Sequence, residues 1–132
     1  HDGKMFLIYS GSLVGIDYTT GLVTALAGRN ADLTDPAAWS KLDYPLQKSG
    51  IYNGQWQLGT GHGMWSHDED GNLIYVFHNA EYDNGRYGGR DAQVRRVHWS
   101  AEGMPILDMQ SMEELNPDYA DVTMEINVAD AV

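Results

Sequence analysis

The chain has 132 residues, of which 42% are hydrophobic, and this apolar content excludes an intrinsically disordered protein. Its 19 acidic residues outnumber 8 basic ones, and the net charge of −11 argues against nucleic acid or an acidic membrane surface as partners. Cysteine is absent, so disulfides and thiolate chemistry are excluded and the cellular compartment stays open.

The first part of the chain predicts a pair of strands and a short helical turn. Residues 5–10 form an apolar run after a turn signal, and residues 22–26 are the expected partner strand. Residues 34–39 predict a helical turn, because capping side chains precede Pro36, which suits its first position. Proline and glycine breakers predict irregular chain over residues 41–59.

The rest of the chain repeats this β pattern. Residues 63–66 and 73–78 are expected strands around a turn at 68–72, and a glycine-rich loop is expected over 84–89. Further expected elements are a half-buried strand over 92–99, a turn and extended segment over 101–108, a helical turn over 111–115 and a final strand over 121–128. The pattern predicts an all-β fold, and by itself it suits sandwiches, barrels and propellers equally.

Three segments carry a more specific signal. Residues 11–41 contain the runs Tyr-Thr-Thr-Gly-Leu-Val-Thr-Ala and Asp-Leu-Thr-Asp-Pro-Ala-Ala-Trp-Ser-Lys. Residues 59–63 read Gly-Thr-Gly-His-Gly, and residues 88–99 place Gly-Arg before an alternating strand that ends in Val-His-Trp, followed by a turn with Gly and Pro over 102–107. In this order they resemble, respectively, a fourth-blade strand and loop, a glycine–histidine turn that starts the fifth blade, and a fifth-blade motif of glycoside hydrolase family 43.

This resemblance implies about two blades of a five-bladed β-propeller, from the C-terminal part of an arabinofuranosidase-like or xylosidase-like enzyme. Residues 1–58 would form the fourth blade with its loops, and residues 59–132 the fifth blade and a closing strand. The implied activity is inverting hydrolysis of α-L-arabinofuranosyl or β-xylosyl linkages in plant polysaccharides or oligosaccharides. Family members use three carboxylates on the first three blades, so the catalytic acids are expected upstream and none is assigned here.

The resemblance assigns two candidate site residues. His62 matches a histidine that faces the central channel and helps to hold a hydrated calcium-like ion, although calcium prefers about six to eight oxygen ligands. Arg90 matches an arginine that reaches the sugar hydroxyls, since a planar guanidinium donates to two neighbouring hydroxyls at once. The alternatives are a histidine that only packs between glycine turns, and a surface arginine that pairs with Asp83 or Asp91.

Two other classes of function stay open. A non-catalytic carbohydrate-binding domain would share the Trp- and Tyr-rich β character, and a structural β-domain would bind only protein. Trp56 and Trp65 flank His62 and could stack on sugar rings, although packing in the sheet core is the commoner role. Residues 68–72 resemble the start of a calcium loop but lack its closing glutamate, so a solvated turn is expected.

The resemblance leads to a first prediction about association. Two blades without the rest of a propeller expose sheet edges and an apolar sheet face. We therefore expect the 132-residue chain, produced alone, to associate with itself, or with the N-terminal blades when these are supplied. Light scattering of the purified chain checks this, and a monodisperse monomer of 14.7 kDa would contradict it.

Overall fold

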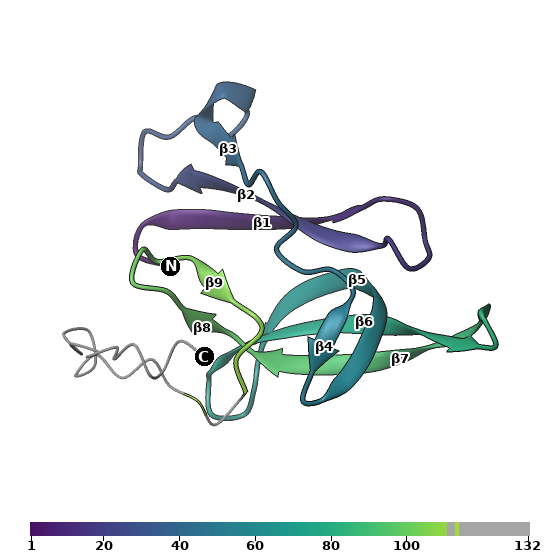
Figure 1. Ribbon diagram of the computed structural model, residues 1–132. Helices are drawn as coiled ribbons and strands as arrows, with labels where there is room; N and C mark the ends of the chain where they lie inside the picture. The colour runs from purple at the N-terminus through teal and green to yellow at the C-terminus, as the bar shows by residue number, and fades with distance from the viewer. Residues whose placement is uncertain (111–112, 114–132) are drawn as a thin grey trace, which may run out of the picture.

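The structure is a computed structural model that describes residues 1–110 and 113, and its regular elements are strands apart from one short 3₁₀ helix (Figure 1). The strands form a sheet β1–β2–β3, a sheet β4–β5–β6–β7 and a hairpin β8–β9. The strands are β1 Lys4–Gly11, β2 Thr19–Leu26, β3 Trp39–Lys41, β4 Gly50–Tyr52, β5 Gln55–His67, β6 Leu73–Asp83, β7 Arg86–Arg96, β8 His98–Trp99 and β9 Pro105–Ile106. The predicted all-β class is confirmed, and no helix among the described residues is long and apolar enough to cross a membrane.

The first sheet follows the predicted pattern closely. Strand β1 pairs antiparallel with β2 over their whole lengths, and β3 adds to the other edge of β2. The predicted helical turn is the 3₁₀ helix Pro36–Ala38, in which the Asp35 carboxylate accepts a hydrogen bond of 2.9 Å from the backbone N–H of Ala37. Both predicted strands and the helical turn are therefore confirmed.

Two predictions of irregular chain are wrong in part, since residues 42–49 do lie outside the strands, and both failures involve an Asn-Gly turn. Residues 41–59 contain β4 and the start of β5, which fold back on each other at Asn53 and Gly54. The expected glycine-rich loop over 84–89 is a tight turn at Asn84 and Gly85, after which β7 begins. All four turn residues have positive φ, which matches the twist of the flanking strands and permits a two-residue hairpin.

The remaining predictions are met in part. The turn at 68–72 is confirmed, because the Asp68 carboxylate accepts hydrogen bonds from the backbone N–H groups of Asp70 and Asn72. The expected strand over 92–99 is divided between β7 and β8, and the strand expected over 63–66 is the end of the much longer β5. The helical turn expected over 111–115 and the strand expected over 121–128 lie outside the fully described part of the chain.

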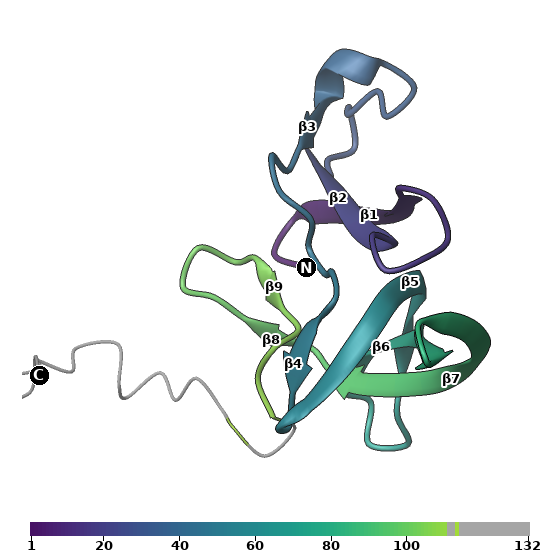
Figure 2. The same ribbon diagram turned by 45° about the vertical axis from the view of Figure 1, so that its right-hand side comes forward.

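The two large sheets pack face to face around one apolar core (Figures 1 and 2). Its centre is the buried group Tyr75, Phe77, Val97 and Leu107, against which Ile8 of the first sheet packs. The Tyr75 hydroxyl forms a buried hydrogen bond of 2.7 Å with the Thr20 hydroxyl, so a polar contact joins the two sheets in addition to the apolar packing. Burial raises the pKa of the Tyr75 phenol, which therefore stays protonated.

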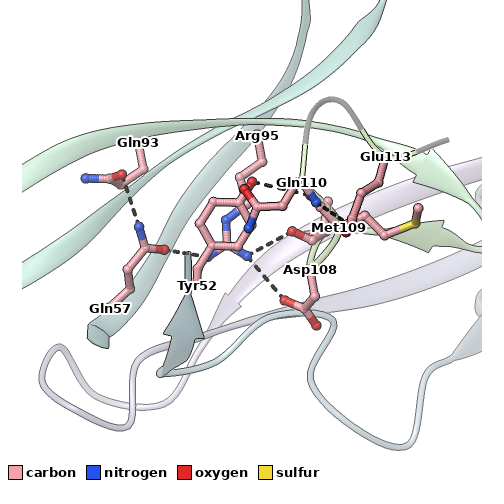
Figure 3. A network of polar contacts seen from close by, with 9 residues as sticks. Tyr52, Gln57, Gln93, Arg95, Asp108, Met109, Gln110 and Glu113 are labelled. Atoms are coloured by element: carbon pink, nitrogen blue, oxygen red, sulfur yellow. Dashed lines mark hydrogen bonds and ion pairs between the residues drawn. The ribbon is translucent and has the colours of Figure 1, made fainter. Parts of the chain in front are cut away.

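A buried arginine fixes the chain after β9 (Figure 3). The Arg95 side chain is 5% exposed, and its Nη1 donates to the Leu107 carbonyl at 2.9 Å and to the Asp108 carboxylate at 3.2 Å. Its Nη2 donates to Gln57 Oε1, and the guanidinium lies 3.8 Å from the centre of the Tyr52 ring. These contacts tie β4, β5 and β7 to residues 107–108.

Each large sheet also has an outer face that carries exposed apolar side chains. On β1, Met5 and Leu7 alternate with the core residue Ile8 and are 42% and 47% exposed. On the second sheet, Val76 points away from the core, because it lies between the core residues Tyr75 and Phe77. Its partners on the neighbouring strands, Met64 and Val94, share that outer face and are 58% and 59% exposed. The change of sheet falls between β3 and β4, and the assignment of the sheets to fourth and fifth blades stays a prediction.

The close contact of Tyr75 with Gly63 generates a stability prediction. A methyl group at Gly63 would overlap the Tyr75 ring, which is fully buried and cannot move without disturbing the core. We expect Gly63→Ala to lower the free energy of unfolding by about 1–3 kcal/mol, as measured by urea denaturation of the full-length protein. Gly28→Ala is the matched control, because a methyl group there meets nothing within 4 Å, and equal losses in the two variants would contradict the prediction.

Candidate functional site

His62 lies at a double irregularity in the middle of β5. The pairing of β5 with β6 shifts register between Leu58 and Gly61 and again between Gly61 and Met64. Such bulges bend a strand and redirect a side chain. Residues 59–63, which were expected to form a glycine–histidine turn that starts the fifth blade, are a bulged stretch within β5, where His62 has a φ of +53° and an exposed side chain.

The imidazole of His62 faces a second histidine, which the sequence pattern did not single out. The rings of His62 and His78 are 6.2 Å apart, and His78 stacks on Tyr18 at 5.6 Å. Tyr18 fits there because its neighbour Gly61 has no side chain: a Cβ atom at Gly61 would lie 2.7 Å from the Tyr18 ring. The site therefore contains a ladder of three rings, Tyr18, His78 and His62.

Arg90 belongs to the same region of the second sheet. It pairs with Ala80 on β6, two residues beyond His78, and positions two apart on a strand share a face. Burial, the positive charge of Arg90 and the neighbouring His62 lower the pKa of His78, in that order. His78 is therefore neutral at pH 7 and offers one donor and one acceptor nitrogen.

The Arg90 side chain is exposed and held by a tyrosine. Its Nε donates to the Tyr87 hydroxyl at 2.6 Å, which leaves the two terminal nitrogens without a hydrogen-bond partner among the described residues. The alternative of an ion pair with Asp83 or Asp91 is not met within residues 1–110. Asp91 instead shares a hydrogen bond with Glu81, which raises the pKa of the Glu81 carboxyl.

The donor set near His62 does not fit a calcium ion held by this chain alone. Within the described residues, no group of three or more His, Cys, Asp or Glu side chains is placed to hold a metal. The ring beside His62 is a second imidazole, that of His78, which also lies near the positive charge of Arg90, whereas calcium prefers carboxylate and carbonyl oxygens. A metal-binding role of His62 therefore depends on ligands from outside the described residues.

The two tryptophans that flank His62 have different environments. Trp65 packs against Tyr75 with ring centres 5.5 Å apart, and its Nε1 donates to the Phe6 carbonyl, so the expected core role is confirmed. Trp56 is 67% exposed, so the same expectation is wrong for this residue. Trp56 lies at the start of β5, where the strand pairs with β4, and there the side chain remains exposed among the described residues.

The proximity of His78 and Arg90 generates a pH prediction. We expect His78 in the full-length protein to titrate below the usual histidine pKa of 6.5, and Arg90→Gln to raise this pKa by removing a positive charge. NMR of labelled histidine checks both, with Arg86→Gln as a matched control on the same strand. Because the folded state binds this proton less tightly, the stability that His78 contributes is lost as the pH falls below 6.5. A pKa that Arg90→Gln leaves unchanged would contradict the proximity.

Comparison with known proteins finds a family and relatives that resemble this chain. Residues 1–105 match the model of glycosyl hydrolases family 43. The extracellular exo-α-(1→5)-L-arabinofuranosidase of Streptomyces avermitilis is 32% identical over 123 residues, which are 89% of this chain and 25% of that protein. The α-L-arabinofuranosidase 43 of Humicola insolens is 34% identical over 110 residues, which are 79% of this chain and 22% of that protein.

Solved structures agree with these relatives. The crystal structure of an α-L-arabinofuranosidase from Lactobacillus brevis superposes with a TM-score of 0.66 and 32% identity, covering 78% of this chain and 32% of that one. A thermostable family 43 glycoside hydrolase gives a TM-score of 0.64 at 25% identity, covering 83% of this chain and 33% of that one. The chain thus spans about a quarter of the curated relatives and has the predicted fold, part of a five-bladed β-propeller. From its sequence and its fold alike, this chain belongs to glycoside hydrolase family 43.

Proposed function

We propose that the full-length protein is an inverting glycosidase that cleaves α-L-arabinofuranosyl linkages, or β-xylosyl linkages as a second choice, in plant polysaccharides or oligosaccharides. The observation that carries the proposal is the exposed, tyrosine-held guanidinium of Arg90 beside His62 and His78, in a chain of this family. Relatives named as α-L-arabinofuranosidases support the choice of sugar. The catalytic carboxylates lie outside this chain in our proposal.

Arg90 would bind the sugar whose linkage is cleaved. Its Nε is engaged by the Tyr87 hydroxyl, so the guanidinium plane is held while both terminal nitrogens stay available for neighbouring hydroxyls. Neutral His78 would offer a further donor and acceptor to hydroxyls or to water, and the His62 ring lies beside it. These groups bind and orient, whereas proton transfer belongs to two carboxyl groups about 6.5–9.5 Å apart, one of them protonated.

The outer faces of both sheets would be covered by other blades of the same protein. Met5 and Leu7 on one side, and Met64 and Val94 on the other, give each outer face an exposed apolar centre. Packing of each face against another sheet would remove this surface from water, as in any layered β-architecture. This arrangement would also surround the His62 bulge and add the ligands that a metal ion there requires.

A carbohydrate-binding domain without catalytic activity is the second candidate. The observation in its favour is the exposed ring of Trp56, which could stack on a sugar and needs no catalytic acid to do so. Such a domain would bind the same sugars and hydrolyse none, so hydrolysis by the full-length protein separates the two candidates.

The proposed function predicts a loss of activity on removal of Arg90. We expect the full-length protein to release 4-nitrophenol from an aryl α-L-arabinofuranoside, with inversion at the anomeric carbon seen by NMR. Two charge-assisted hydrogen bonds are lost in Arg90→Ala, so we expect kcat/KM to fall by about 100-fold. Arg86→Ala, on the same strand, should leave kcat/KM unchanged. Absence of hydrolysis of this arabinofuranoside and of the corresponding aryl β-xyloside would refute the enzymatic proposal, and full activity of Arg90→Ala would refute the role of Arg90.

A further inference from the structure

The β6–β7 hairpin contains a bulge next to Arg90. Tyr87 and Arg90 are three residues apart, a spacing that puts two side chains on opposite faces of a regular strand. The register of β7 on β6 shifts between them, because β7 carries one extra residue, Gly88. Tyr87 pairs with Tyr82. Arg90 pairs with Ala80, two residues earlier on β6, so Arg90 and Tyr87 lie on the same face.

Two tyrosines lie in series beside Arg90. The Tyr87 hydroxyl accepts the 2.6 Å hydrogen bond from Arg90 Nε, and the guanidinium carbon lies 5.9 Å from the centre of the Tyr87 ring. The rings of Tyr82 and Tyr87 meet edge to face, with their centres 6.1 Å apart. The Tyr82 hydroxyl lies beside the β1–β2 connection, 3.8 Å from the position that a Cβ atom of Gly15 would take. Tyr82 thus contacts Tyr87 through its ring, whereas Tyr87 contacts Arg90 through its hydroxyl.

We propose that Tyr87 and Tyr82 are positioning residues, which set the direction of the Arg90 guanidinium and act on the substrate only through it. An arginine side chain has several rotatable bonds and loses rotamer freedom when it binds a ligand. The hydrogen bond to Tyr87 restricts these rotamers before binding and uses neither terminal nitrogen, so less entropy is lost when the guanidinium binds two hydroxyls. The inference rests on the proposed function for the substrate, but the direction of Arg90 can be measured without one.

NMR of the Arg90 Nε–H group in the full-length protein tests the contact without any substrate. We expect this proton to exchange slowly with water in the wild type, because the Tyr87 hydroxyl accepts it. Tyr87→Phe removes the acceptor and should speed the exchange about tenfold. Tyr44→Phe is the matched control, because it removes the hydroxyl of another exposed tyrosine, and it should leave the exchange unchanged. Equal exchange in Tyr87→Phe and the wild type would overturn the inference.

Kinetics on the aryl α-L-arabinofuranoside tests whether the tyrosines act through Arg90. We expect Tyr87→Phe to lower kcat/KM about tenfold, and to have no further effect in an Arg90→Ala background. Equal losses in both backgrounds would overturn the inference, because Tyr87 would then act apart from Arg90.

The two tyrosines should differ in which part of the side chain matters. Tyr82→Ala should lower kcat/KM about threefold, and Tyr82→Phe should recover most of this loss, because the ring of Tyr82 makes the contact. A loss that Tyr82→Phe does not recover would overturn the role of this ring. Absence of hydrolysis by the wild type would remove the enzymatic proposal alone, since the exchange measurement still decides whether Tyr87 holds Arg90.

Discussion

Two tyrosine rings occupy the space that side chains at positions 61 and 63 would need, and the rest of the structure depends on this packing. Through Tyr75, which is fully buried and bonded to Thr20, the second sheet is fixed on the first. Through Tyr18, the end of the β1–β2 connection reaches His78. His62 lies between the two glycines with its side chain exposed, so the contact that joins the sheets also displays the candidate functional residue.

A second constraint acts at the other end of the chain. Arg95 brings a charged group into a nearly dry environment, where burial lowers its pKa. The rings of Tyr52 and Phe77 and three hydrogen-bond acceptors, on Gln57, Leu107 and Asp108, compensate for the lost water. An incompletely paired buried charge is costly, so these partners are held in place as a unit. The segment after β9 is thereby fastened to β4 and β7 of the second sheet (Figure 3).

Elements that depend on neighbouring residues in the sequence were predicted, whereas elements that depend on pairing with distant strands were not. Strands β1, β2 and β6 are apolar runs with clear turn signals, and local patterns suffice to place them. Strand β4 is only three residues long and follows breakers, so its existence depends on pairing with β5. The Asn-Gly pairs at 53 and 84 did carry a usable signal, since this dipeptide favours a two-residue hairpin.

The candidate site was predictable only through the resemblance, and only in part. His62 and Arg90 stand in recognisable motifs, but nothing local connects them to His78 or Tyr18. Those two residues join the site through strand register and through the missing side chain of Gly61, which are properties of the folded sheets. The exposure of Trp56 has the same origin, because it follows from where β5 leaves β6.

A crystal structure of the full-length protein with a pentose bound would show whether the two sheets are inner layers of a larger fold and whether Arg90 binds the sugar. We expect other sheets to cover the outer faces around Met5 and Met64, and the sugar to lie within hydrogen-bonding distance of the Arg90 guanidinium. A structure in which those faces remain in solvent, or in which the pentose binds away from Arg90 and His62, would contradict this expectation.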